Sequence, residues 1–145
     1  MYDDSVAGNL DGCTRLDYYL AFDGSKLVGI TGIYSVNDEE AWLGWYGVVP
    51  ECRSRGYGNA ILDFTLEKMK SYGYKIALLY TEKDVNAEAC KLYKKKGFAE
   101  GKTYTLLDGK VSREQQDRSD ACHETVFFKS LDGSSVDSWD GIPVF

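Results

Sequence analysis

The sequence lacks several features that would assign it to a specialised class of protein. No apolar run approaches the roughly 20 residues needed to span a bilayer, and the N-terminus, MYDDSVAGNLDG, lacks the basic and apolar regions of a secretory signal. These absences predict a soluble, cytoplasmic protein with no membrane partner. Internal repeats and low-complexity segments are also absent, so the sequence predicts one domain, residues 1–130, followed by a C-terminal tail, residues 131–145.

Neither the cysteines nor the charges indicate a metal, redox or nucleic-acid function. Cys13, Cys52, Cys90 and Cys122 are scattered without CxxC spacing, which predicts no metal and favours free cytosolic thiols over disulfides. Basic residues number 17 against 23 acidic ones, a net charge of −6. That balance argues against a general nucleic-acid-binding protein and is compatible with cationic substrates such as amines.

Hydrophobic periodicity predicts strands and helices that alternate in the middle of the chain. Asp23-Gly24 separates two β-rich runs and favours a hairpin, while Pro50 ends the apolar run that follows. A final antiparallel pair completes the pattern, which predicts a mixed α/β (α+β) fold with a mostly antiparallel sheet flanked by helices. The expected strands are 17–22, 26–34, 41–49, 74–81, 103–107 and 121–129, and the expected helices are 59–71 and 87–96.

A basic turn with two glycines stands directly before the first expected helix. Gly56 and Gly58 allow the backbone to approach a ligand closely, and the free N–H groups of a helix N-terminus favour an anion such as a phosphate. Arg53 and Arg55 add positive charge. The alternative to a phosphate-binding turn is a purely structural tight turn, in which the glycines only relieve backbone strain. A Walker loop needs a lysine after its second glycine, and the dinucleotide fingerprint needs a small residue where Ile61 stands, so neither motif fits.

The turn Arg53-Ser54-Arg55-Gly56-Tyr57-Gly58 resembles the signature of the GNAT superfamily of acetyl-CoA-dependent N-acetyltransferases, which reads Arg or Gln, two residues, Gly, one residue, then Gly or Ala. A second family feature follows, where Asn86 opens a helix that carries Tyr93 and ends in Gly97-Phe98. The resemblance covers about residues 17–129. It implies the GNAT fold, acetyl-CoA as cosubstrate, and transfer of the acetyl group to a primary amine of a small molecule or peptide by direct attack in a ternary complex.

The resemblance also implies which residues contact the cofactor. Backbone N–H groups from residues 54 to 59 would bind the pyrophosphate, the pantetheine would lie along the strand that ends the apolar run, and Asn86 would add a side-chain hydrogen bond. The residues expected to bind the cofactor are Tyr46, Gly47, Val48, Arg53, Ser54, Arg55, Gly56, Tyr57, Gly58, Asn59, Asn86 and Tyr93.

Tyr93 is the expected general acid for the departing thiolate. A phenol has an ordinary pKa of about 10 and is therefore protonated at neutral pH. The alternative is that Tyr93 has no catalytic role and is only an aromatic side chain on the inner face of the helix. Family members that use a carboxylate base often place a Glu on the strand before the turn, but residues 41–49 contain no acid. Glu40, just before that strand, is the candidate base, acting through water. His123 is a weaker candidate, since a single His on a strand is more often structural.

The segment before the first expected strand is shorter than the strand and two helices with which GNAT domains usually begin. That N-terminal unit is therefore expected to be shortened or missing, with another element covering the groove. Trp139, Ile142, Val144 and Phe145 form an apolar C-terminal end that would pack on the same chain or on a second copy in a homodimer. A catalytically inactive CoA-binding regulatory or interaction module is the alternative function.

Overall fold

The described residues form two compact units. The computed structural model describes residues 14–107, 110–112, 122–134, 136–139 and 141. The first unit contains the described residues up to 77 together with 130–134, and the second contains those from 78 to 129 and from 135 to 141.

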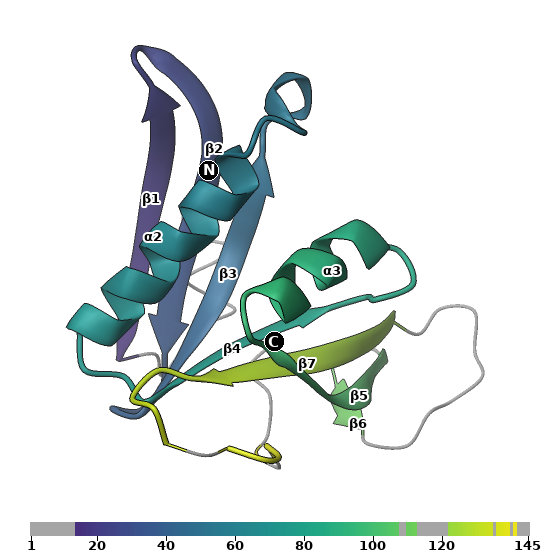
Figure 1. Cartoon of the computed structure of the whole chain (residues 1–145). Coiled ribbons are helices and arrows are strands. Elements are labelled where there is room, and N and C mark those ends of the chain that lie inside the picture. The colour runs from purple at the N-terminus through teal and green to yellow at the C-terminus, as the bar shows by residue number, and fades with distance from the viewer. Residues whose placement is uncertain (1–13, 108–109, 113–121, 135, 140, 142–145) are drawn as a thin grey trace. The chain divides into compact units, whose positions relative to one another are not determined.

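Three antiparallel strands and one long helix build the first unit. Strands β1 (Arg15–Asp23), β2 (Lys26–Ser35) and β3 (Glu40–Val48) pair in sequence order, and α2 (Tyr57–Ser71) lies across one face of them (Figure 1). A short 3-10 turn, η1 (Pro50–Cys52), leads from β3 toward α2. The expected hairpin is confirmed: Asp23 pairs with Lys26, and Gly24 takes the positive φ of 64° that the tight turn requires.

The helix α2 is held against β2 by buried apolar side chains and a buried hydrogen bond. Ile61, Leu62 and Met69 are buried on its inner face. The hydroxyls of Thr31 and Thr65 hydrogen-bond at 2.8 Å between the strand and the helix, which satisfies two polar groups that burial would otherwise penalise. These contacts determine where the N-terminal end of α2 lies in the first unit.

The opposite face of the same strands carries an aromatic cluster. Trp45 packs edge-on against Tyr18 with ring centroids 4.9 Å apart, and Tyr34 stacks on Trp42 at 6.1 Å. Tyr34 also contacts Trp45 at 5.7 Å. Aromatic pairs with these separations contribute beyond their buried area, so both faces of the β2–β3 pair are packed within the first unit.

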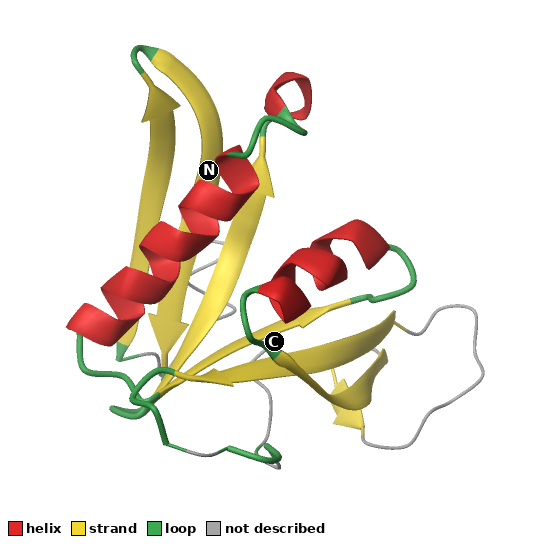
Figure 2. Ribbon diagram, viewed as in Figure 1, coloured by secondary structure: helices red, strands yellow, loops and turns green. Residues whose placement is uncertain are grey.

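The second unit is built around β7 (Cys122–Ser130). Its strands run in the order β4 (Ile76–Thr81), β7, β5 (Ala99–Leu107) and β6 (Lys110–Ser112), and β7–β5 and β5–β6 are antiparallel. Helix α3 (Ala87–Lys95) follows β4 along the chain, and Figure 2 distinguishes the helices (red) from the strands (yellow). The ring of Tyr93 on α3 contacts those of Phe98 and Phe127 at about 6 Å, which anchors the helix in this unit.

The expected mixed α+β fold with mostly antiparallel strands is confirmed, and the differences lie at element boundaries. Helix α2 begins two residues earlier than expected because Gly56 is its N-cap. Strand β4 begins later because the N–H of Tyr74 bonds to Met69 O at the end of α2, leaving Tyr74 in the helix stop rather than the strand. The short elements η1 and β6 fall outside the expected helices and strands.

The tail packs on its own chain where the structure describes it. Trp139 is buried, and the hydroxyl of Tyr104 donates to the carbonyl oxygen of Gly141 at 3.3 Å. The other apolar tail residues, Ile142, Val144 and Phe145, and the short N-terminal segment, residues 1–13, lie outside the described residues.

The thiols that the structure describes are buried. Cys52 and Cys90 are free and buried, whereas Cys13 and the side chain of Cys122 are not among the groups described. Within the described ranges, no helix has both the length and the apolar character to cross a membrane.

Replacing Gly29 with alanine is expected to destabilise the first unit. The added Cβ would lie 2.6 Å from the carbonyl oxygen of Gly47 and 2.6 Å from Cδ1 of Ile61. Such overpacking typically costs about 1–3 kcal/mol in the free energy of unfolding, measurable by urea denaturation. Gly47→Ala is the matched control, because its Cβ would meet nothing within 4 Å; equal losses in both variants would contradict the close-approach explanation.

Candidate functional site

The connection between β3 and α2 presents backbone N–H groups at a helix start that no side chain caps. Gly56 is the N-cap with a left-handed φ of 85°, and it makes no side-chain cap bond. The first bond of the helix runs from Ala60 N to Gly56 O, so the N–H groups of residues 57–59 precede the helical ladder. An added Cβ at Gly56 would meet nothing within 4 Å, which leaves open space beside the turn.

The charges around this turn favour an anion. Helix α2 has no acidic residue in its first turn, while exposed Arg53 and Arg55 precede it. The guanidinium Nε of Arg53 donates to Val48 O at 3.4 Å, which draws this side chain back toward the end of β3. The partial positive charge of a helix N-terminus and nearby arginines both favour negatively charged groups. Ser54, between the two arginines, has a positive φ of 64°, which is uncommon for a residue other than glycine.

A bulge in β3 directs two neighbouring aromatic side chains to opposite faces. The β2–β3 register shifts between Ile30 and Gly32, so Thr31 lies opposite two residues of β3, Trp45 and Tyr46. Trp45 takes an unusual positive φ of 49° and joins the aromatic cluster. Tyr46 instead donates its hydroxyl to Gly58 O in α2 at 2.6 Å. The bulge therefore ties the end of β3 to the first turn of α2.

Asn86 and Tyr93 belong to the second unit, where they bracket most of α3. Asn86 is the N-cap residue of α3, as expected, but its side chain makes no cap bond. Its Nδ2 instead donates to Oγ1 of Thr81 at the end of β4, at 3.0 Å. Tyr93 is buried, with its ring against Phe98 and Phe127. The helix positions both residues, and their separation of seven residues is almost two turns.

The two candidate bases from the sequence have different surroundings. Glu40 is the first residue of β3, and its carboxylate accepts a hydrogen bond from Asn37 Nδ2 at 3.1 Å. It stands at the opposite end of β3 from Val48, roughly 26 Å away at the rise of about 3.3 Å per strand residue. His123 Nδ1 lies 3.3 Å from Oγ1 of Thr105 on the neighbouring strand. The contact gives His123 a structural partner.

A carboxylate that is not among the residues expected from the sequence, Glu124, is half-buried in β7. Burial, and then the charge of Glu82, raise the pKa of Glu124 above its ordinary value. Tyr104 lies across from it on β5. No motif marks this residue in the sequence, because only its burial and its neighbours distinguish it from other acids.

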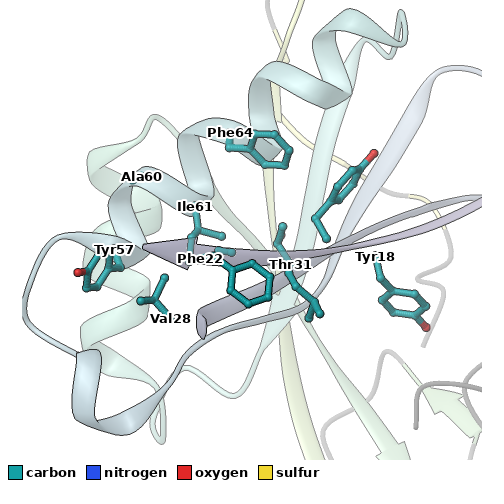
Figure 3. A pocket seen from close by; sticks show the side chains of 11 residues that line it. Tyr18, Phe22, Val28, Thr31, Tyr57, Ala60, Ile61 and Phe64 are labelled. Carbon is teal, nitrogen blue, oxygen red and sulfur yellow. The ribbon is translucent and has the colours of Figure 1, made fainter. Parts of the chain in front are cut away.

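A separate pocket of about 480 Å³ lies in the first unit between the β1–β2 hairpin and α2. Tyr57, Ala60, Ile61 and Phe64 line it from α2, and Phe22, Val28 and Thr31 line it from the hairpin (Figure 3). At its edge the hydroxyl of Tyr57 donates to Asp23 at 2.5 Å. The pocket therefore adjoins the turn through Tyr57 but is mainly aromatic and aliphatic.

A known protein family matches this chain over more than half of its length. The sequence model of the acetyltransferase (GNAT) family matches residues 2–98, which include the turn, Asn86 and Tyr93. The chain belongs to the GNAT acetyltransferase family. The resemblance read from the two sequence motifs is thereby confirmed.

Solved structures agree with this GNAT assignment at the level of fold. The ribosomal-protein-S18-alanine N-acetyltransferase from Escherichia coli is 19% identical with a TM-score of 0.67, over 94% of this chain and 81% of that one. A GNAT acetyltransferase from Elizabethkingia anophelis with acetyl-CoA bound is 18% identical with a TM-score of 0.70, over 88% and 82%. A Bacillus subtilis acetyltransferase in complex with CoA is 15% identical with a TM-score of 0.68, over 88% and 84%. No curated protein matches the sequence.

Tyr46→Phe is expected to lower the stability of this GNAT protein. The substitution keeps the ring and removes the donor to Gly58 O, at a cost of about 0.5–1.5 kcal/mol in the free energy of unfolding. Tyr72→Phe, at the end of α2, is the control for loss of a phenol whose hydrogen bond, to the exposed hydroxyl of Tyr19, does not reach the helix start. Equal stability of Tyr46→Phe and the wild type would show that the bond to α2 contributes nothing.

The same tyrosine predicts a loss of stability in alkali. Burial, and then the charge of Asp63, raise the pKa of Tyr46 to about 12. The folded state thus holds this proton more tightly than the unfolded state, where the pKa is about 10. Its contribution to the free energy of unfolding is complete below pH 10 and is lost as the pH rises toward 12. Urea denaturation across this window should therefore show a smaller loss of stability in Tyr46→Phe than in the wild type.

Proposed function

We propose that this protein is an N-acetyltransferase that moves the acetyl group of acetyl-CoA to a primary amine of a small molecule or peptide. The observation that carries the proposal is the helix start at Gly56, which combines uncapped N–H groups, open space and no first-turn acid. Family membership and neighbours solved with acetyl-CoA or CoA support the same cosubstrate. We further propose that the protein acts in the cytoplasm, as a monomer or a homodimer, without nucleic-acid or membrane partners.

The residues of the turn fit the pyrophosphate of the cosubstrate. Backbone N–H groups of residues 54–59 would bind its oxygens, because a helix N-terminus stabilises an anion without any side chain. Arg53 and Arg55 would add charge-assisted contacts. The backbone of Tyr46, Gly47 and Val48 at the end of β3 would hold the pantetheine amides, and the side chain of Asn86 would give one further hydrogen bond.

The reaction is a direct transfer in which atoms and charges balance. Bound acetyl-CoA supplies an activated thioester carbonyl. The amine nitrogen forms a bond to the carbonyl carbon, the bond from carbon to sulfur breaks, and the amine releases a proton. Tyr93 would donate its phenolic proton to the sulfur, and a carboxylate would accept the amine proton, with Glu40 the candidate from the sequence. The catalytically inactive CoA-binding module is the alternative, and it predicts binding without turnover.

Gly58→Val is expected to weaken acetyl-CoA binding at least tenfold, which corresponds to about 1.4 kcal/mol. A branched side chain at this position would obstruct close approach of a phosphate to the first turn of α2. Isothermal titration calorimetry with acetyl-CoA measures the change. Ala60→Val, on the exposed side of the same helix turn, controls for a β-branched residue in a helix. Unchanged affinity in folded Gly58→Val would count decisively against the proposed phosphate site.

Tyr93→Phe is expected to reduce kcat by roughly 10²- to 10⁴-fold, the usual range for general acid catalysis, while acetyl-CoA affinity stays nearly intact. The substitution keeps the ring that packs on Phe98 and Phe127 and removes only the proton donor. Thiol release with a panel of amines measures kcat, and Tyr72→Phe is the control. Turnover within about threefold of the wild type would refute the acid role and assign thiolate protonation to water.

A further inference from the structure

Strand β1 forms an outer edge of the first unit (Figure 1). One side of β1 pairs with β2 from Arg15 to Asp23, and no other strand in the described part of the chain pairs with its remaining side. The bulge in this hairpin adds its extra residue, Val28, to β2 and leaves β1 uninterrupted. A nine-residue strand without proline or lysine is poorly protected against pairing with another chain, because its outer N–H and C=O groups remain available.

Exposed apolar side chains gather beside this edge. Most of the large apolar side chains that are exposed in the described residues belong to the β1–β2 hairpin or to α2 and its end: Leu20, Phe22, Leu27, Phe64 and Tyr72. Phe22 and Phe64 also line the pocket of about 480 Å³ between the hairpin and α2 (Figure 3). An exposed apolar patch next to an open strand edge is typical of a surface that contacts another protein.

The sequence of β1 is complementary to itself. Two antiparallel copies related by a two-fold axis at Tyr19 place each residue opposite the one that is equally far from Tyr19. Arg15 then lies opposite Asp23 at both ends, so opposite charges meet twice, and such cross-strand pairs stabilise antiparallel sheets. The other opposed pairs are Leu16 with Phe22, Asp17 with Ala21, and Tyr18 with Leu20. The most exposed apolar side chains of β1, Leu20 at 55% and Phe22 at 57%, each meet an apolar side chain of the other copy.

Shifted registers lose this complementarity. Opposed side chains of an antiparallel pair lie on the same face of the sheet, so the partner of each residue can change only in steps of two. One step places Asp17 opposite Asp23, where like charges repel. The step in the other direction places Arg15 opposite Ala21 and leaves Asp23 with no opposed residue of the strand. The register centred on Tyr19 is therefore the favoured one.

The charged residues at the two ends of β1 are already oriented by their own chain. The guanidinium of Arg15 donates to Asp17 at 2.9 Å and to the hydroxyl of Tyr74 at 3.0 Å, and Asp23 accepts from the hydroxyl of Tyr57 at 2.5 Å. A guanidinium has five N–H donors and a carboxylate has two acceptor oxygens, so each group can make a further contact. Side chains ordered before binding lose less conformational freedom on association.

We propose that two copies of this chain form a homodimer by pairing their β1 strands, antiparallel about a two-fold axis at Tyr19. The pairing joins the sheets of two first units edge to edge, with both α2 helices on the same face of the joined sheet. Main-chain hydrogen bonds provide affinity, and the opposed charges and apolar side chains fix the register. This inference concerns assembly and does not rest on the proposed acetyl transfer, so either can fail without the other.

Sedimentation velocity over a range of protein concentrations tests the pairing. The wild type should sediment with twice the mass of one chain. Leu20→Lys should raise the dissociation constant of the dimer by about tenfold or more, because it removes an apolar contact and adds a charge to the strand edge. Val85→Lys is the control, since Val85 is an apolar side chain with 73% exposure outside β1, and it should leave the dimer unchanged. A wild type that is monomeric at every concentration, or a dimer that Leu20→Lys leaves intact, would overturn the proposal.

Engineered cysteines in β1 test the axis and the register. Opposed Cα atoms of an antiparallel pair are about 4.5–5.5 Å apart, which a disulfide can bridge, so Tyr19→Cys should cross-link two copies under mild oxidation. Two copies of Ala21→Cys would lie four residues apart along the strand, roughly 13 Å, and should not cross-link. Both variants also carry Cys13→Ser and Cys122→Ser, because the other native thiols are buried. Non-reducing electrophoresis reads the result, and a cross-link in Ala21→Cys or none in Tyr19→Cys would contradict the proposed pairing.

Discussion

The close packing of α2 on β2 is the constraint on which the candidate phosphate site depends. Gly29 has no side chain, so Ile61 can approach the backbone of the strand, and the Thr31–Thr65 bond fixes the helix against the sheet. A helix that is held firmly keeps its N-terminal N–H groups in one place. Backbone dipoles stabilise an anion effectively only when they are oriented before it binds. The packing of α2 therefore determines where the N–H groups of the glycine turn lie in the first unit.

The irregular backbone of the first unit is concentrated next to that turn. Trp45 and Ser54 have positive φ without being glycine, and Gly56 is left-handed at the helix N-cap. Strained residues persist where the surrounding packing determines them. At Trp45 the packing is the aromatic cluster; its neighbour Tyr46 bonds to Gly58. The bulge thus links the packing of one sheet face to the position of the glycine turn on the other.

The second unit distributes its charges unevenly. Glu100 is neutralised by two lysines, whereas Glu124 is half-buried beside another carboxylate. Stability alone favours the first arrangement, because a compensated charge costs less to bury.

Local patterns in the sequence were enough to predict most elements and the family. The Asp23-Gly24 hairpin, the helix start at the glycine turn and the helix stops at Gly73 and Gly97 each depend on residues close together in the chain, and the glycines have the positive φ that such stops require. The motif around Gly56 and Gly58 identified the GNAT family because its chemistry is contained in a few consecutive residues.

Tertiary structure decided the features that depend on residues far apart in sequence. The late start of β4 follows from the bond between Tyr74 and Met69, which competes with a strand for the same N–H. The tether from Tyr46 to Gly58 follows from a bulge that no local pattern marks. Glu124 resembles any other surface acid in the sequence, and only the folded chain shows that it is half-buried beside Glu82. Burial and charge pairing are properties of neighbours in space, and the order of residues alone does not specify them.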